Sequence, residues 1–241
     1  MSTMPKVSVV TTTYNDMDNL CRIMEEVRKQ TYKNIEHIIV DGGSTDGTVE
    51  MLTRLSEEQP GAFRWISEPD DGIYDAINKG LKLCTGDIIG TCFDHFADET
   101  VLARMVEIME REGTDGVHGD LCYMDGDRVV RKWHQGQGHI RSGWMPGHPT
   151  LYLKREVYEK FGLYKTDYVC SADYEYMVRI LKDGEVRLSY IPETLIEMDY
   201  GGTSTSSLKA YWVSLVEGHR GLKENQVRFA WFTDACRILR L

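Results

Sequence analysis

The sequence predicts an α/β fold in which a mainly parallel sheet is flanked by helices. An apolar, β-branched run at residues 7–12 precedes a polar loop and a helical stretch at 20–29. The same pattern returns at once, with a strand at 35–40 and a helix at 48–55. Strands that alternate with helices form parallel sheets. The length of 241 residues, 41% of them hydrophobic, suits one such domain.

The same alternation continues along the chain. We predict a strand at 63–67, a helix at 73–83, a strand at 88–92 and a helix at 100–111. Residues 118–145 are rich in glycine and β-prone side chains, which predicts a small antiparallel part and a long loop. Because ligands of parallel sheets gather at the carboxyl ends of the strands, we expect the polar loops to meet in one cleft.

Composition excludes several classes of protein. The 28 Lys+Arg and 38 Asp+Glu residues give a formal charge of -10, so we expect no nucleic-acid partner. Six cysteines are scattered without close CxxC pairs and the N-terminus has no secretion signal, which predicts a cytoplasmic protein. No apolar run approaches the roughly 20 residues that cross a bilayer.

Asp41 is the first candidate for chemistry. It ends the second predicted strand, and the two glycines that follow allow a ligand to approach the backbone closely. Asp46 and Thr48 then cap the next helix. A plain strand-to-helix turn with a helix cap is the alternative interpretation of this loop.

Three segments in order resemble the signature segments of family 2 glycosyltransferases. They read VSVVTTTYN at 7–15, VDGGSTDGT at 40–48 and SEPDDGIYDAINKG at 67–80. The similarity covers nearly all of residues 5–205 and continues through shorter segments at 86–87, 118–120, 147–149, 171–175 and 201–204. The resemblance implies a Rossmann-like GT-A fold that transfers a sugar from a nucleotide-sugar donor, expected to be a UDP-sugar, to a glycan or lipid-linked glycan.

The resemblance assigns Thr12, Tyr14 and Asp41 to the uridine of the sugar donor. A tyrosine ring can stack on a base, and a carboxylate can accept hydrogen bonds from its N–H groups. The third segment lies beside the diphosphate in relatives.

That third segment adds Asp71, Asp75 and Asn78 to the predicted sugar-donor pocket. The alternative for this helix start is structural. Ile73 and Ile77 belong to an apolar stripe, and Asp75 then faces water.

The metal site departs from the family pattern. Relatives carry a DxD-like segment that binds magnesium or manganese against the diphosphate. Here residues 91–98 are shortened, and Phe93 stands where a polar residue is expected. We predict a divalent ion, Mn²⁺ or Mg²⁺, held by Asp94 and His95, with Asp98 as a possible third ligand; the imidazole favours manganese. Metal-independent or inactive chemistry is the alternative.

Asp173 matches the catalytic carboxylate of the family and opens an amphipathic helix. As a general base it activates an acceptor hydroxyl for a single displacement that inverts the anomeric carbon. A helix-capping role is the alternative. The resemblance also places His148 near the acceptor, and Trp144 offers a flat face for a sugar. Structural roles in a Gly-Pro loop and in packing are the alternatives for these two.

We expect one domain over 1–205, with a nucleotide-binding half at 1–98 and an acceptor half at 99–205. Residues 206–241 form a helical tail that mixes aromatic and basic side chains. The tail has three open interpretations: contact with the cytoplasmic face of the inner membrane, a homodimer interface, or packing on its own domain.

Small enzymes of this kind, by resemblance, serve bacterial exopolysaccharide, O-antigen and related surface polysaccharide assembly. One alternative is a non-catalytic protein that binds a nucleotide-sugar or a glycan on the same fold. A sugar nucleotidyltransferase is the other, although residues 11–16 lack the glycine-rich, basic loop that it needs.

Overall fold

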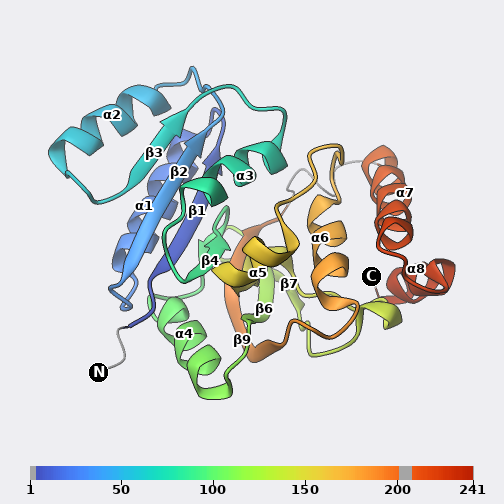
Figure 1. Ribbon diagram of the computed structural model, residues 1–241. Helices are drawn as coiled ribbons and strands as arrows, with labels where there is room; N and C mark the ends of the chain where they lie inside the picture. The colour runs from blue at the N-terminus through green and yellow to red at the C-terminus, as the bar shows by residue number, and fades with distance from the viewer. Residues whose placement is uncertain (1–3, 201–207, 241) are drawn as a thin grey trace.

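The computed structural model describes residues 4–200 and 208–240, and nine strands within these ranges form one sheet (Figure 1). The strand order is β3-β2-β1-β4-β8-β6-β9-β5, and β7 pairs with β6 outside this path. The predicted α/β fold is confirmed. The expected antiparallel part is continuous with the parallel part, because β8 joins the two halves.

The first half of the sheet is parallel and contains β1 (Val7–Thr13), β2 (Ile35–Asp41), β3 (Arg64–Ser67) and β4 (Ile88–Thr91). All four strands run in one direction, and β1 lies between β2 and β4. Their carboxyl ends therefore share one edge of the sheet.

The second half of the sheet mixes strand directions. Its members are β5 (His95–Phe96), β6 (Gly116–Asp125), β7 (Arg128–Trp133), β8 (Tyr152–Lys154) and β9 (Leu188–Asp199). Strands β6 and β9 are parallel, whereas β7 and β8 run antiparallel to β6. The short β5 lies within the 91–98 segment and pairs with the end of β9.

Helices α1 (Met17–Lys29), α2 (Thr48–Glu58) and α4 (Val101–Glu112) cover one face of the sheet. Val9 of β1 packs in the same apolar cluster as side chains of α1 and α4, and Ile39 of β2 packs with α2. These side chains alternate along the strands with others that face the opposite way, as the pleat of a strand requires.

The opposite face carries α3 (Ile73–Leu83), α5 (Arg155–Phe161) and α6 (Ala172–Leu181). Val10, Ile38 and Val40 pack against these helices. Two short 3₁₀ turns, Ile140–Ser142 and His148–Thr150, lie in the connections of this half.

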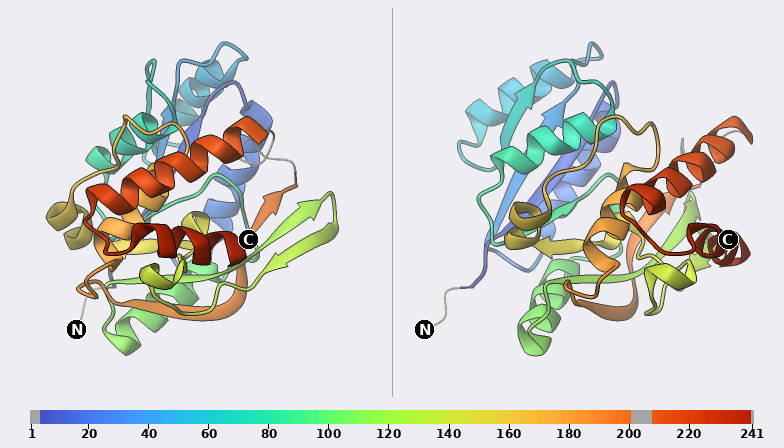
Figure 2. Two further views of the ribbon diagram at one scale, coloured as in Figure 1. Left: turned by 90° about the vertical axis from the view of Figure 1, so that its right-hand side faces the viewer. Right: turned by 45° about the vertical axis from the view of Figure 1, so that its right-hand side comes forward.

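Helices α7 (Leu208–Glu224) and α8 (Ala230–Arg240) follow, with α7 packed against α6 and α8 against α7 (Figure 2). The 201–204 segment and the predicted domain boundary at residue 205 lie outside the described residues, so that division stays a prediction. Among the described helices, none has the length and apolar character needed to cross a membrane.

Candidate active site at the carboxyl edge of the sheet

Asp41 ends β2, and its carboxylate is fully buried under the loop that follows. Its Oδ2 accepts hydrogen bonds from the backbone N–H of Gly43 at 3.1 Å and of Ser44 at 3.0 Å, and from the Ser67 hydroxyl at 2.6 Å. The carboxylate thus fixes the β2–α2 loop and ties it to the end of β3. Its predicted contact with uridine stays a prediction.

Tyr14 stands beside this loop with 64% of its surface exposed. A Cβ atom on Gly42 would lie 3.3 Å from the Tyr14 ring and 2.6 Å from the Asp70 carboxylate, so a larger residue there would displace the Asp70 side chain. The Asn15 side chain accepts a hydrogen bond from the Thr45 N–H at 2.8 Å, which fastens the first loop to the second. Thr12 is half-buried just before Tyr14. The Tyr14 ring is therefore open to solvent at the carboxyl edge of the sheet.

The start of α3 holds the next predicted residues. Asp71 is exposed, and its backbone N–H donates a hydrogen bond to the Asp75 carboxylate at 3.3 Å. The same carboxylate forms an ion pair with Lys79 at 3.3 Å. Asn78 is buried, and its amide donates to the Tyr164 carbonyl at 2.8 Å and accepts the Tyr164 N–H at 3.0 Å. Asn78 therefore joins α3 to the segment before α6.

Asp173 lies in the first turn of α6 and is partly exposed. The Tyr74 hydroxyl, from α3, donates a hydrogen bond to its Oδ1 at 3.1 Å. Burial, and then the neighbouring Asp173 carboxylate, raise the pKa of Tyr74 far above its usual range. Tyr74 stays protonated and holds one carboxylate oxygen in place. The sequence reasoning did not single out this tyrosine, although it lies within the third signature segment.

A second residue that the sequence reasoning missed holds the segment before Asp173. The buried Glu217 carboxylate, from α7, accepts hydrogen bonds from three successive backbone N–H groups. They belong to Val169 at 2.6 Å, Cys170 at 3.0 Å and Ser171 at 3.0 Å. Glu217 thus satisfies three backbone N–H groups of the segment that leads into α6 and ends at Ser171, the residue directly before the helix. No sequence signal identified it, because it lies outside the family segments.

His148 is close to Asp173, whose charge acts on it. Burial lowers the pKa of His148, so the ring is neutral near pH 7, and its Nε2 lies 2.9 Å from the Tyr164 hydroxyl. The Phe93 ring stacks with His148 at 6.2 Å, which brings the loop after β4 next to the acceptor-side residues. Trp144, by contrast, is 7% exposed, and its indole N–H donates to the Gln135 carbonyl at 2.9 Å.

Asp94 lies in the loop after β4, and burial raises the pKa of its carboxyl to about 6. No group of the described residues donates a hydrogen bond to this carboxylate. His95 Nδ1 lies 2.8 Å from Glu26, which leaves Nε2 for a ligand, and the charge of Asp199 acts on both Asp94 and His95.

The Asp94 carboxylate and the His95 ring, which Glu26 orients, fit a divalent ion that takes its other ligands from diphosphate and water. Within residues 4–200 and 208–240 there is no set of three or more His, Cys, Asp or Glu side chains able to hold a metal. Asp94 and His95 are therefore two candidate ligands, and an ion held by them would complete its coordination with diphosphate oxygens and water.

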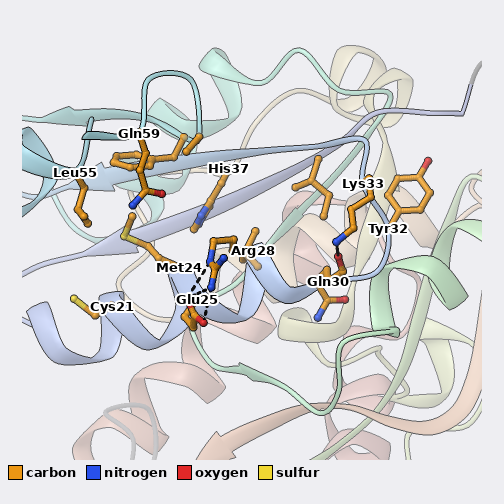
Figure 3. A pocket seen from close by; sticks show the side chains of 14 residues that line it. Cys21, Met24, Glu25, Arg28, Gln30, Tyr32, Lys33, His37, Leu55 and Gln59 are labelled. Atoms are coloured by element: carbon orange, nitrogen blue, oxygen red, sulfur yellow. Dashed lines mark hydrogen bonds and ion pairs between the residues drawn. The ribbon is translucent and has the colours of Figure 1, made fainter. Parts of the chain in front are cut away.

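A cavity of about 340 Å³ lies away from this edge, between α1, α2 and the first half of β2 (Figure 3). Among the polar side chains that line it, Arg28 pairs with Glu25, and His37 lies 2.9 Å from the Thr11 hydroxyl. The cavity does not include any of the predicted site residues.

These features define a class of protein: a GT-A glycosyltransferase, with one parallel half of the sheet and a mixed half that presents the Asp173 carboxylate beside Tyr74 of α3. Residues 8–181 match the family model described as Glycosyl transferase family 2, and the chain belongs to that family. The predicted family is therefore confirmed.

Two curated relatives are named glycosyltransferases. An uncharacterized glycosyltransferase of Mycobacterium tuberculosis is 32% identical over 197 residues, which cover 74% of this chain and 70% of the relative. The PGL/p-HBAD biosynthesis glycosyltransferase of Mycobacterium bovis is 24% identical over 216 residues, covering 84% and 80%.

Solved structures share the fold. TarS 1-349 of S. aureus in complex with UDP-GlcNAc has a TM-score of 0.76 at 14% identity, over 98% of this chain and 72% of that chain. This chain covers 43% of the longer TarS structure. A mannosyltransferase from Pyrobaculum calidifontis in complex with GDP-Man and Mn²⁺ has a TM-score of 0.66 at 17% identity, over 99% and 74%.

Proposed function

We propose that this glycosyltransferase moves a sugar from a UDP-sugar to a hydroxyl of a glycan or lipid-linked glycan by a single, inverting displacement. The observation that carries the proposal is the Asp173 carboxylate, which is partly exposed and held at one oxygen by Tyr74 at 3.1 Å. A carboxylate that is oriented at one oxygen and open at the other is suited to accept a proton.

In the proposed reaction, the second Asp173 oxygen takes the proton of the acceptor hydroxyl. No described residue donates a hydrogen bond to this Oδ2 atom. The hydroxyl oxygen forms a bond to the anomeric carbon while the bond from that carbon to the diphosphate oxygen breaks. The electron pair of the broken bond leaves with the nucleoside diphosphate. Tyr74 and Glu217 hold the base in place during this step.

For the sugar donor, we propose that the open Tyr14 ring stacks on the base, with Thr12 and Asp41 beside the ribose and base. We propose that Asp71 and Asp75, at the start of α3, face the diphosphate side of the sugar donor. The complexes of TarS with UDP-GlcNAc and UDP support a UDP-sugar, although GDP-Man in the other neighbour shows that the fold also takes a guanine nucleotide.

Asn78 and Trp144 support the pocket in this proposal and do not touch the substrates. Both polar groups of Asn78 are used by the Tyr164 backbone, and the Trp144 indole is enclosed. His148 is the acceptor-side residue that we propose to contact a sugar hydroxyl. It lies near Asp173, and its ring is neutral near pH 7.

We propose that Asp94 and His95 hold a divalent ion, Mn²⁺ or Mg²⁺, whose remaining ligands are diphosphate oxygens and water. The partnerless Asp94 carboxylate and the orientation of His95 by Glu26 support this assignment. When bound, such an ion neutralises charge on the departing diphosphate.

The acceptor is proposed to be a glycan or lipid-linked glycan of a bacterial surface polysaccharide. A relative named for PGL/p-HBAD biosynthesis supports a biosynthetic role. The transferred sugar is proposed to be a hexose or an N-acetylhexosamine, and a few pocket contacts select between them.

A panel of UDP- and GDP-sugars tests the proposal, with release of nucleoside diphosphate measured with Mn²⁺, with Mg²⁺ and with EDTA. We expect turnover with one UDP-sugar and loss of turnover in EDTA. The second candidate is a non-catalytic sugar-nucleotide-binding protein, which the lack of a three-ligand metal cluster in the described residues favours. Binding of UDP without turnover under every metal and acceptor condition would support that candidate.

A further inference from the structure

The outward face of α8 is apolar, which reverses the usual arrangement of a surface helix. Trp231 is 68% exposed and Leu239 is 87% exposed. With Ala235 and Ile238 they recur at the spacing of one helical stripe, and Phe232 borders it. A surface helix ordinarily turns such a stripe toward the core. This one is turned toward solvent.

Specific contacts on the inner face of α8 fix this orientation. Arg237 is buried, and its guanidinium lies 4.4 Å from the centre of the Tyr174 ring. A Cβ atom on Gly218 of α7 would collide with that guanidinium, so the arginine fills the space between the helices. The Thr233 hydroxyl donates to the Arg141 carbonyl at 3.2 Å. The polar side of α8 is therefore the side that packs, and the apolar side is left outside.

Helix α7 extends the apolar surface. Trp212 and Val216 are exposed one turn apart, and His219 follows on the same stripe. His219 lies 2.6 Å from Asp234 of α8, so the two stripes adjoin at this pair. The left view of Figure 2 shows both helices lying across the face that is turned toward the viewer. We call this face, made by Tyr211, Trp212, Val216, Phe229, Trp231, Phe232, Ile238 and Leu239, the tail face.

The charge of the tail is opposite to that of the whole chain. Residues 208–240 contain six Lys and Arg against three Asp and Glu, whereas the full chain has 28 against 38. Lys223 and Arg228 are exposed beside the apolar side chains, and no described carboxylate pairs with them. Aromatic side chains bordered by basic ones are characteristic of helices that lie in the headgroup region of anionic bilayers.

We propose that the tail face docks on the surface of an anionic lipid bilayer, with α7 and α8 parallel to the membrane plane. A second copy of this chain is the competing occupant. A two-fold dimer through this face would bring its basic side chains toward those of the partner copy, whereas anionic headgroups neutralise them. Charge complementarity therefore favours the lipid surface.

Docking has a consequence for the reaction, and this consequence rests on the proposed function. Glu217 of α7 is bonded to the segment that precedes Asp173. A docked tail therefore holds the catalytic carboxylate in a fixed orientation to the bilayer, where a lipid-linked acceptor is anchored.

Co-sedimentation of the full chain with vesicles tests the proposal. The vesicles contain either phosphatidylcholine alone or equal parts of phosphatidylcholine and phosphatidylglycerol. We expect binding to the anionic vesicles, weakened by salt, and a loss of more than about tenfold in the variant Trp231→Ser/Phe232→Ser/Leu239→Ser. The matched control is Val129→Ser/Val130→Ser on β7, two valines that are 43% and 42% exposed and lie outside the tail face. This control keeps full binding.

A second variant, Lys223→Gln/Arg228→Gln, keeps the test informative if the triple variant does not fold, and we expect it to lose the preference for anionic vesicles. Thermal melting and UDP binding establish that each variant is folded. The proposal is overturned if the unmodified chain stays in the supernatant with anionic vesicles, or if both variants sediment like it. The proposal is also overturned, in favour of a second copy of the chain, by the following pair of results. The unmodified chain does not bind vesicles, and light scattering shows it as a dimer that the triple variant no longer forms.

Discussion

The Asp94 side chain is half-buried, yet no described residue donates a hydrogen bond to its carboxylate. Partial burial disfavours an unpaired carboxylate, and a cation is the partner that its charge favours. His95 is oriented by Glu26 in the way that metal-binding histidines are oriented by a carboxylate. These two observations make the shortened acidic loop a candidate metal site despite its departure from the family pattern.

At the residue scale, we predict that Asp94→Ala weakens UDP binding in Mn²⁺ by more than about tenfold, because the ion that links the protein to the diphosphate is lost. The matched control is Asp98→Ala in the same loop, whose carboxylate is engaged by Arg104 at 2.7 Å and by the Thr100 N–H. Calorimetric titration with and without EDTA measures the effect. Equal Mn²⁺-dependent affinity in the Asp94→Ala variant and the unmodified chain would place the ion elsewhere.

Individual site residues were predicted unevenly. The sequence pointed to Asp173 through its motif, and the structure places it beside Tyr74, which is 99 positions away in the chain. A pairing over that distance leaves no local pattern. Residue type also does not tell whether an amide such as Asn78 binds a ligand or, as here, a backbone segment. The roles of these residues in binding and catalysis stay predictions.

At the scale of elements, α7 acts on the start of α6. The three N–H groups that Glu217 accepts belong to the residues directly before the helix that carries Asp173. A carboxylate buried with three partners is a strong constraint on the backbone. The tail is thus part of the structure that positions the catalytic base.

We predict that Glu217→Ala lowers kcat by more than about tenfold while the KM for the sugar donor stays near that of the unmodified enzyme, because the base is misplaced and the nucleotide loops are untouched. The matched control is Glu224→Ala on the same helix, whose carboxylate makes surface pairs with Lys165 and Arg220. Steady-state kinetics of both variants give the comparison. A parallel loss in the control, or a rise in KM alone, contradicts a positioning role for Glu217.

The elements with a strong hydrophobic period were predictable. The runs at 7–12 and 35–40 became β1 and β2 with one further residue each. Helix α1 begins at Met17, earlier than expected, because the Asp46 side chain accepts the Met17 N–H at 3.1 Å. That contact joins two loops far apart in sequence. The two residues of β5 were not predicted, since so short a strand has no measurable period.

At the scale of the whole molecule, strand order was the feature that local patterns left open. The sequence predicted a mainly parallel sheet, and the parallel half is present. The other half depends on β8 lying between β4 and β6. Such pairings are decided by long-range packing, which residue periodicity does not encode.

The buried histidines make the stability of the whole fold depend on pH. Burial lowers the pKa of His37 and of His118 to about 4, from an ordinary value of 6.5. Between these values the unfolded chain binds protons that the folded chain does not. The free energy of unfolding therefore falls as the pH drops from 6.5 toward 4, by up to about 1.4 kcal/mol per pH unit for each histidine.

Urea denaturation at pH 7 and pH 5 measures this dependence. We expect His37→Gln to reduce the difference in unfolding free energy between the two pH values, and the same change at the exposed His139 serves as the control. An unchanged difference in the His37→Gln variant contradicts the assignment of this histidine as a neutral buried group.

The central claim is that Asp173 deprotonates the acceptor hydroxyl, and Asp173→Asn tests it most directly. The amide keeps the size of the side chain and the hydrogen bond from Tyr74, but it cannot take up the proton. With the active UDP-sugar identified, UDP affinity and the rate of sugar transfer are measured on the same preparation. The account predicts unchanged affinity and a rate lower by more than about a hundredfold. Transfer at the unmodified rate would contradict it.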